Sequence, residues 1–386
     1  MYLSIPSATY RDCLTTARTA MVTRGSLPVL AMLHFRITPE APYVLEVTST
    51  DLDVSLTQLI PLTEPGGPGA VCISLASLTA IKPDRGTPVR IDHAPLMKQF
   101  NSDTPDAQIL YVKAGHSAAA HLEILPSEDF PHWTNPPGPE EFTCLIPGRT
   151  LQCIAESIAF QSTEETRPVL NGVLLSPDAG GTIVATNGRM LAKWQSKVTP
   201  EEVILPRKAC NVLTKLGLSS ATCAITREYD DHNTSISFRS SKSVLHTKLV
   251  PGKFPNYQAV IPETDSLTLN SAITFADPVG ISSWLSSLPV PKNTSSVRLC
   301  PRLPHFVDII HEQGHLTVTA YLQNNPPEIA FAPKLLATAL AIIPGTLHLT
   351  DDTSPGVLRH SHALAVLMPM RITAPASTES NESAAA

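Results

Sequence analysis

The 386-residue sequence has little charge and few aromatic residues. Asp, Glu, Lys and Arg make up 16% of it, Phe, Trp and Tyr 5%, and the formal net charge at pH 7 is −6. A protein that binds nucleic acid through its bulk charge is basic. That class is excluded, so any contact with DNA has to come from a local basic surface. The apolar share of 42% is sufficient for packed cores.

Segments typical of secreted or membrane proteins are also lacking. The N-terminus has no basic region followed by a long apolar stretch, and the apolar run at 335–343 is too short to span a bilayer. The seven cysteines are odd in number and form no Cys-x-x-Cys pair, a pattern typical of reduced, mostly buried thiols. We therefore expect a soluble cytoplasmic protein, associated with the nucleoid and with no membrane partner.

Proline-rich segments at 126–141 and 251–264 divide the chain into three parts that resemble one another. Phe-Pro pairs occur in both segments, 124 residues apart, and Pro-Val-Leu begins at both Pro28 and Pro168. The strands after these Pro-Val-Leu motifs end in similar turns, within TSTDLDVSL and VATNGRMLA. Ordered matches at offsets near one third of the length predict an internal triplication.

Each part has two segments with helical apolar spacing and about eight short alternating segments. The helical segments are 7–24, 74–82, 148–165, 206–217, 276–288 and 332–343. Ser7 is expected to cap the first of them. The sequence thus predicts an α+β fold in three domains. Their expected bounds are 1–131, 132–258 and 259–372, followed by a disordered polar tail at 373–386.

Short motifs in the same order resemble those of the bacterial DNA polymerase III beta subunit family, the sliding clamps. They are Leu27-Pro28-Val29-Leu30, Thr50-Asp51-Leu52, Leu170-Asn171-Gly172-Val173-Leu174, Ala185-Thr186-Asn187-Gly188-x-x-Leu191-Ala192, Phe254-Pro255-Asn256-Tyr257, Val260-Ile261-Pro262, Glu328-Ile329-x-Phe331 and Leu367-Met368-Pro369-Met370-Arg371. The resemblance extends over nearly the whole chain. It implies three tandem copies of the DNA-clamp fold and a head-to-tail homodimeric ring, with helices lining the hole and sheets outside.

The function implied by the resemblance is that of a sliding clamp, a processivity factor that encircles double-stranded DNA of any sequence. The implied partners are a second copy of the chain, DNA polymerase III subunits, a clamp loader and other proteins that carry a clamp-binding peptide. A clamp-like paralogue with an altered partner set or lost loading is the alternative.

A ring that slides has to contact phosphates rather than base edges, since phosphates carry no sequence information. Its candidate DNA-binding residues are Arg11, Arg18, Arg24, Lys82, Arg85, Arg149, Arg167, Arg207, Lys208 and Lys215. Arg24 and Arg167 also match basic positions near DNA in the family. For any single residue, a solvated helix face explains the spacing equally well. The predicted helices of the third part carry only Lys334, so weak, salt-sensitive contact with DNA is expected.

The resemblance also implies a groove between the second and third domains that binds a short peptide with apolar anchors. Its expected residues are Leu170, Thr186, Gly188, Arg189, Met190, Leu191, Pro255, Val260, Val366, Met368, Pro369, Met370 and Arg371. Flexible, polarisable methionine suits a surface that accepts different partners. Taken alone, the run 366–370 is more typical of a core strand. Arg189-Met190 and Gln258-Ala259 differ from the His-Arg and basic residues frequent in the family, so a changed motif preference is expected.

The segment HEQGH at 311–315 matches the His-Glu-x-x-His pattern of zinc proteases, a different class of function. That pattern needs a helix, because only there do both imidazoles lie on one side. The flanking segments alternate like strands, which predicts a solvated hairpin turn in which His311 and His315 diverge. His360 and His362, expected on one face of a strand, have no third ligand nearby in the sequence. We therefore predict no metal site, no cofactor and no catalytic group, and a zinc hydrolase is the most distant alternative.

Closing a ring would remove the two exposed sheet edges of an open protomer, which otherwise invite aggregation. The candidate contacts are the segment 118–122 in the first domain and Trp284, Leu285 and Leu288 in the third. Buried Trp and Leu are also ordinary core residues, which is the alternative for these three.

Overall fold

The computed structural model describes residues 1–22, 27–92, 109–114, 120–133, 140–164, 166–196, 201–227, 234–262, 271–289, 295–302 and 304–371. Arg24 and the predicted tail 373–386 lie outside these residues. Within them, no helix is long and apolar enough to cross a membrane.

The chain divides into two compact units. The first unit is Met1–Ile158, Asn171–Thr182 and Ser196–Lys253, and the second unit is Ala159–Leu170, Ile183–Gln195 and Phe254–Ala386. The expected domain boundary after residue 131 lies inside the first unit, and the one after residue 258 lies close to Phe254, where the second unit resumes. The division into three domains therefore remains a prediction.

Two helices and eight strands occur three times in the same order in the described residues. The first repeat contains β1 (Tyr2–Pro6), α1 (Ser7–Ala17), β2 (Met32–Ile37), β3 (Val44–Thr50), β4 (Val54–Pro61), β5 (Gly69–Ser74), α2 (Leu75–Ala80), β6 (Pro88–Asp92), β7 (Ile109–Ala114) and β8 (Ala120–Leu125). The second contains β9 (Glu140–Pro147), α3 (Gly148–Ser157), β10 (Gly172–Ser176), β11 (Thr182–Thr186), β12 (Met190–Gln195), β13 (Val203–Pro206), α4 (Arg207–Leu216), β14 (Ser220–Arg227), β15 (Thr234–Arg239) and β16 (Ser243–Lys248). The third contains β17 (Ser271–Phe275), α6 (Pro278–Ser287), β18 (Val297–Arg302), β19 (Phe306–His311), β20 (Gly314–Gln323), β21 (Ile329–Phe331), α7 (Pro333–Ile342), β22 (Thr346–Leu349), β23 (Gly356–His360) and β24 (Ala363–Leu367). This repetition confirms the predicted triplicated α+β fold.

Short 3-10 helices connect these elements. They are η1 (Arg18–Ala20), η2 (Pro28–Ala31), η3 (Ser127–Asp129), η4 (Ile158–Phe160), η5 (Pro168–Asn171), η6 (Asp178–Gly180) and η7 (Gln258–Val260). They shorten two predicted helices, because α1 gives way to η1 after Ala17 and α3 gives way to η4 after Ser157. The expected serine cap is wrong as well: Ser7 is already helical and buried, and Pro6 occupies the cap position without a side-chain hydrogen bond.

Antiparallel pairing builds an extended sheet in each unit. In the first unit the strand order is β1-β6-β7-β8-β5-β2-β3-β4-β16-β15-β14-β9, and β10 pairs with β13. In the second unit the order is β11-β12-β24-β23-β22-β17-β20-β19-β18-β21. The repeats are therefore joined edge to edge, β4 to β16 in the first unit and β12 to β24 in the second.

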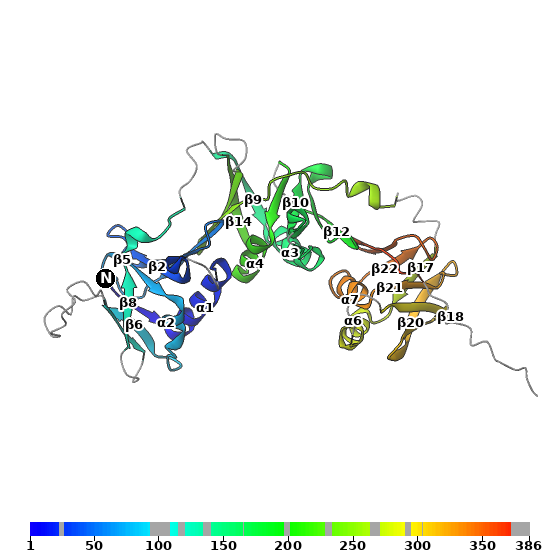
Figure 1. Ribbon diagram of the computed structural model, residues 1–386, viewed down its shortest axis with the longest axis horizontal. Coiled ribbons are helices and arrows are strands. Elements are labelled where there is room, and N and C mark those ends of the chain that lie inside the picture. The colour runs from blue at the N-terminus through cyan, green and yellow to red at the C-terminus, as the bar shows by residue number, and fades with distance from the viewer. Residues whose placement is uncertain are drawn as a thin grey trace, which may run out of the picture. The chain divides into compact units, whose positions relative to one another are not determined.

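The helices of each repeat pack in pairs, α1 with α2, α3 with α4 and α6 with α7, as Figure 1 shows. Apolar side chains from these helices and from the strands form the cores, because alternate strand residues point to one face of a sheet. Tyr10, Phe35, Phe160, Trp194 and Phe331 are among the largest buried side chains. The loops at the ends of β11 and β24 lie outside these cores, where they can contribute to a surface site.

Candidate functional site

A turn from Thr186 to Met190, which connects β11 to β12, shapes one wall of a pocket in the second unit. Thr186 Oγ1 donates to the Met190 carbonyl at 2.8 Å and accepts from the Gly188 amide at 3.1 Å. Asn187 Oδ1 accepts from the Met190 amide at 3.0 Å. Gly188 has φ +84°, a left-handed conformation in which glycine is favoured. The Thr-Asn-Gly sequence thus specifies the turn locally.

The same turn occurs in the first repeat, where Thr50 Oγ1 donates to the Val54 carbonyl at 3.0 Å and Asp51 Oδ1 accepts from the Val54 amide at 2.7 Å. Leu52 adopts φ 80°, as Gly188 does in the second repeat. This equivalence confirms the similarity of the two turns inferred from the sequence. The two turns differ in what they contact. The turn of the second repeat lines the pocket, whereas Asp51 in the first repeat forms an ion pair with Lys208 of α4.

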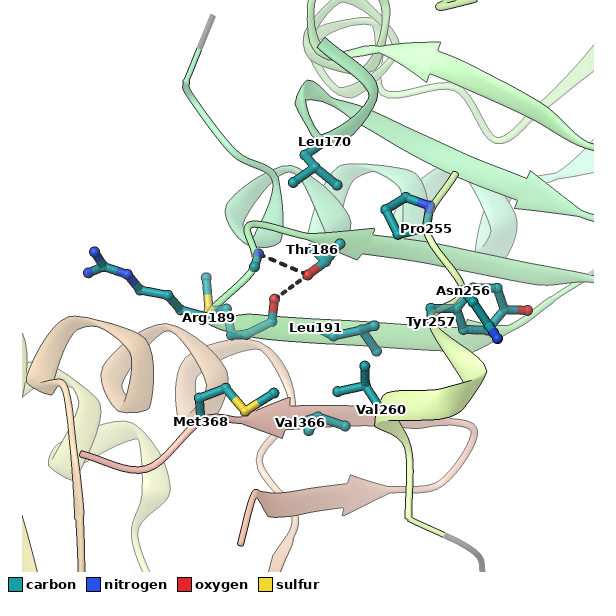
Figure 2. Close-up of a pocket in the computed structure, with 12 residues that line it drawn as sticks. Leu170, Thr186, Arg189, Leu191, Pro255, Asn256, Tyr257, Val260, Val366 and Met368 are labelled. Atoms are coloured by element: carbon teal, nitrogen blue, oxygen red, sulfur yellow. Dashed lines mark hydrogen bonds between the residues drawn. The ribbon is translucent and has the colours of Figure 1, made fainter. Parts of the chain in front are cut away.

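The pocket has a volume of about 550 Å³ and lies entirely within the second unit. Its lining is Leu170, Thr186, Gly188, Arg189, Met190, Leu191, Pro255, Asn256, Tyr257, Val260, Val366 and Met368. The β12–β24 pairing places Leu191 directly opposite Val366, so residues 175 positions apart share one wall. Figure 2 shows these side chains facing the space beside Val260 and Met368, while the Arg189 side chain extends away.

The pocket is apolar in its depth and accessible at its rim. Leu191 and Val366 are buried, whereas Val260 and Met368 are each 36% exposed. Lys193 lies 5.8 Å from the centre of the Tyr257 ring, a cation–π distance that holds the ring at the side of the pocket. A concave apolar surface with few polar groups is suited to binding apolar side chains. Its described lining residues include no arrangement of acid, base and nucleophile.

The structure brings together most of the residues expected for the peptide groove and leaves out the last three. Pro369, Met370 and Arg371 do not line the pocket. The chain turns away after Met368, and the Met370 amide donates to the Ala330 carbonyl at 2.7 Å, forming a bridge to β21. The sequence reasoning missed Asn256 and Tyr257 as lining residues, although both belong to the Phe-Pro-Asn-Tyr motif.

Three of the basic residues expected to contact DNA lie close together, on α1, at the start of η1 and just beyond α2. Arg11, Arg18 and Lys82 line one open cavity of about 900 Å³ together with Tyr10 and Leu14. All three are exposed. Arg11 Nε donates to the Ser7 carbonyl at 3.1 Å, which keeps its guanidinium over the first helical turn. The cavity therefore combines three cations with an apolar floor.

Other candidate cations occupy different settings. Arg149 Nη1 lies 3.9 Å from Glu156 Oε1 and Arg167 Nε lies 3.9 Å from Glu164 Oε2, long separations between partly exposed groups. Arg85 and Lys215 are exposed, and Arg207 is half-buried.

Lys208 has a closer carboxylate partner than Arg149 or Arg167 has. Its ammonium group forms an ion pair with Asp51 and donates to the Met21 carbonyl at 2.9 Å. Only 31% of the lysine side chain and 14% of the aspartate side chain are exposed. These interactions join α4 to the first repeat, and the contact of Lys208 with phosphate stays a prediction.

The HEQGH segment forms the β19–β20 hairpin, as predicted. His311 continues the buried face of Val307 and Ile309, and its Nδ1 accepts from the Gln313 amide at 3.2 Å. His315 lies on the other face, with Nε2 3.2 Å from Asp308 Oδ1. The histidines diverge and the turn residues Glu312 and Gln313 are exposed, as predicted, but His311 itself is buried, with 5% exposed.

The second histidine pair also differs from its predicted arrangement. Strand β23 ends at His360, and Ser361 has φ 50°, so His362 lies in a turn and not on the same strand face. Across the part of the chain that the structure describes, no group of three or more His, Cys, Asp or Glu side chains could hold a metal ion.

Comparisons with known proteins agree with this geometry. The family model "DNA polymerase III beta subunit, central domain" matches residues 145–256. The beta sliding clamp of Pseudomonas putida is 26% identical over 368 residues, which cover 90% of this chain and 94% of that protein. The Pseudomonas aeruginosa beta sliding clamp is 30% identical over 246 residues, 62% of each chain.

Solved clamp structures share the fold. The sliding clamp of Pseudomonas aeruginosa bound to griselimycin has a TM-score of 0.77 at 23% identity, covering 96% of this chain and all of that one. The Bacillus subtilis clamp has a TM-score of 0.77 at 19% identity, covering 97% of this chain and all of that one. With its triplicated fold and ordered motifs, the chain is similar over nearly its whole length to the beta sliding clamps, the bacterial DNA polymerase III beta subunits.

Proposed function

We propose that this protein is a DNA sliding clamp and processivity factor, which encircles duplex DNA as a head-to-tail dimer and tethers polymerases through the pocket of the second unit. It would keep other enzymes on DNA by encircling the duplex and by binding their peptides, and it would catalyse no reaction itself. The observation that carries the proposal is the pocket built around the β12–β24 junction, within a chain similar to this family.

The pocket supports peptide tethering through its shape and composition. Leu191 and Val366 form a buried apolar floor, and the exposed Val260 and Met368 are positioned to close over an inserted side chain. A Met side chain adapts to partners of different shape, which suits one site that serves several enzymes. A short peptide with apolar anchors is therefore the expected ligand.

Repeat symmetry supports closure of a ring. The fourth strand of the first repeat, β4, pairs with the eighth strand of the second, β16, and likewise β12 pairs with β24. In both junctions the fourth strand of one repeat pairs with the eighth strand of the next. The fourth strand of the third repeat is β20, and among the described strands the one eighth strand without such a partner is β8. We therefore expect β20 to pair with β8 of a second copy. Two such junctions close a two-fold dimer.

The edges needed for this junction are open in the described residues. Strand β20 pairs with β19 along 314–319 and with β17 only along 320–323. Strand β8 pairs with β7 along 120–123 and with β5 only at Ile124 and Leu125. The open part of β8 overlaps the predicted contact segment 118–122, of which 118 and 119 lie outside the described residues.

The other expected dimer contacts divide between surface and core. Trp284 is half-buried and packs beneath the start of β20, with its Cζ2 3.3 Å from the position of a Cβ on Gly314. Leu285 and Leu288 are buried within the protomer, 1% and 9% exposed, which favours a core role for both.

DNA contact is proposed to be electrostatic and weak. Arg11, Arg18 and Lys82 form the densest group of candidate cations, and contacts to phosphates allow sliding because they carry no sequence information. With Lys208 neutralised by Asp51, and Lys334 as the one basic residue of α6 and α7, few cations face the duplex. Retention should therefore depend on encirclement rather than on affinity.

Loading onto circular nicked DNA tests the proposal. The purified chain, incubated with a clamp loader and ATP, should remain on the circle through gel filtration in high salt and leave after the circle is linearised. The mass in solution should be that of a dimer of the 41.4 kDa chain. A monomer, or a protein that stays bound after linearisation, would contradict encirclement.

A clamp-like paralogue with an altered partner set is the second candidate. Arg189 and Met190 at the pocket turn, and the loss of basic residues at Gln258 and Ala259, favour it. The two functions separate in one assay, because a paralogue with an altered partner set or lost loading would not support loading and processive synthesis.

A further inference from the structure

Two cysteines lie directly opposite each other at the end of the first unit's sheet. Cys144 on β9 is the register partner of Cys223 on β14. Opposed residues of an antiparallel pair project from the same face, with Cβ atoms about 4.5–5.5 Å apart. Their register places the two thiols side by side on this face, and a thiol–thiol hydrogen bond with Cys223 as the donor accounts for the opposite shifts of their pKa values.

The two thiols differ in reactivity. Cys144 is half-exposed and Cys223 is fully buried. The hydrogen bond from Cys223 lowers the pKa of Cys144 to about 7, against the opposing effect of partial burial. Donating that bond, together with burial, raises the pKa of Cys223. Cys144 is thus the accessible thiol of the pair and the one whose pKa is lowered, and both are properties of an attacking cysteine.

A half-exposed cysteine elsewhere in the chain lacks these features. Cys300 on β18 is opposite Asp308 in the sheet, and burial, with a hydrogen bond to Glu328, raises its pKa to about 11. It has comparable access to solvent and no thiol in register. Cys300 therefore serves as an internal control for simple exposure.

We propose that Cys144 and Cys223 are a reversible redox pair that is oxidised to a disulfide by exchange with glutathione disulfide. The Cys144 thiolate attacks one sulfur of glutathione disulfide, forms a mixed disulfide and releases one glutathione thiolate, which takes up the proton that Cys144 lost. Cys223 then loses its proton and attacks the Cys144 sulfur, releasing the second glutathione. Two protein thiols are oxidised to one disulfide, and one glutathione disulfide is reduced to two thiols.

The position of β9 permits this bond. Disulfide geometry needs Cβ atoms about 3.5–4.5 Å apart, so β9 has to move about 1 Å toward β14. Among the described residues, strand β9 is the last in the order of its sheet and pairs with β14 alone. An edge strand held on one side can make such a shift. The strain retained in the bond keeps it reducible, as is typical of labile disulfides.

Oxidation would stabilise the junction that leads into helix α3, which carries Arg149. Gly148, the first residue of α3, follows β9 directly, and a Cβ there would lie 2.3 Å from the Ser219 carbonyl oxygen just before β14. The β9–β14 pair therefore determines where α3 starts and where Arg149 is placed. Locking the pair should slow amide exchange in β9 and in the first turn of α3.

The test uses the full chain in its native state. The protein is equilibrated with a series of glutathione disulfide to glutathione ratios, quenched in acid, alkylated, and measured by intact mass and peptide mapping. The expected product has lost two of its seven free thiols, with Cys144 joined to Cys223, and returns to seven on addition of dithiothreitol. Cys300→Ser should oxidise to the same extent as the wild type.

The variant Cys223→Ser should stop at one glutathione on Cys144, because no resolving thiol remains. The proposal is overturned if the wild type keeps seven free thiols across the series, if it retains glutathione on Cys144 without forming the bond, or if the oxidised peptides join other cysteines. Peptide mapping of the wild-type protein shows by itself whether Cys144 and Cys223 are joined. The test therefore stays decisive even if Cys223→Ser folds poorly.

Discussion

Replacing Lys208 with methionine distinguishes a structural lysine from a phosphate contact. The Lys208 ammonium lies between Asp51 and the Met21 carbonyl, and the aspartate is only 14% exposed. The neighbouring pair, Lys248 with Asp53, joins the same two repeats at 2.9 Å but is 50% and 70% exposed. Lys248→Met is therefore a matched control with the same chemistry and less burial.

The magnitude follows from that burial. An exposed ion pair contributes about 0.2–1 kcal/mol, and removing one partner of a buried pair costs about 3–5 kcal/mol. Lys208→Met leaves a mostly buried Asp51 carboxylate without its cation, so the expected loss of unfolding free energy is about 2 kcal/mol. Lys248→Met should cost less than about 0.5 kcal/mol. Urea unfolding, followed by circular dichroism and tryptophan fluorescence, measures both.

A second readout separates stability from DNA binding. Removing a phosphate contact lowers the slope of log K against log salt by about one. Lys208→Met should leave this slope unchanged, and Lys215→Met, at an exposed position of the same helix, should lower it. If Lys208→Met is no less stable than Lys248→Met, or if it reduces the salt slope, the structural role assigned to this ion pair is refuted.

Three further predictions follow. Met368→Lys should weaken binding of a fluorescent peptide with leucine and phenylalanine anchors at least tenfold, about 1.4 kcal/mol, whereas Val279→Lys, at an exposed position on α6, should not change it. Gly188→Ala should cost about 1 kcal/mol or more and weaken the same peptide, because its φ is +84°; equal stability in a melting experiment would reject this strain. Burial, with smaller effects of His132 and Arg36, lowers the pKa of His34 from 6.5 to about 4. As the pH falls, His34 is protonated in the unfolded chain before it is protonated in the folded one. The free energy of unfolding should therefore decrease by about 3 kcal/mol between pH 6.5 and 4. His34→Phe should remove that part of the pH dependence.

Much of the architecture is readable from local patterns. The paired turns at Thr50 and Thr186 are specified by side chains that hydrogen-bond to their own backbone, so their sequences predict them directly. The hairpin containing His311 and His315 follows from alternation on both sides of Gly314. These features depend on interactions within about ten residues, which a single sequence displays.

Ends of helices and roles of single charges were less predictable. Ser7 reads as a cap but is buried inside the first turn of α1, since the chain enters the helix directly from β1 at Pro6. The seven-residue spacing of Lys208 and Lys215 indicates a shared helix face, yet one contacts Asp51 and the other is exposed. Spacing identifies a face but not what packs against it.

The sequence by itself determined the threefold repetition and the α+β class, because periodicity and ordered motifs are properties of the chain, whereas most pocket residues were predicted through the resemblance to the clamp family. Only the tertiary structure decided that Leu191 meets Val366, that the chain leaves the pocket after Met368, and that Cys144 faces Cys223. Each of these depends on pairing between strands far apart in sequence, and that register is set by packing of the whole sheet rather than by any local preference.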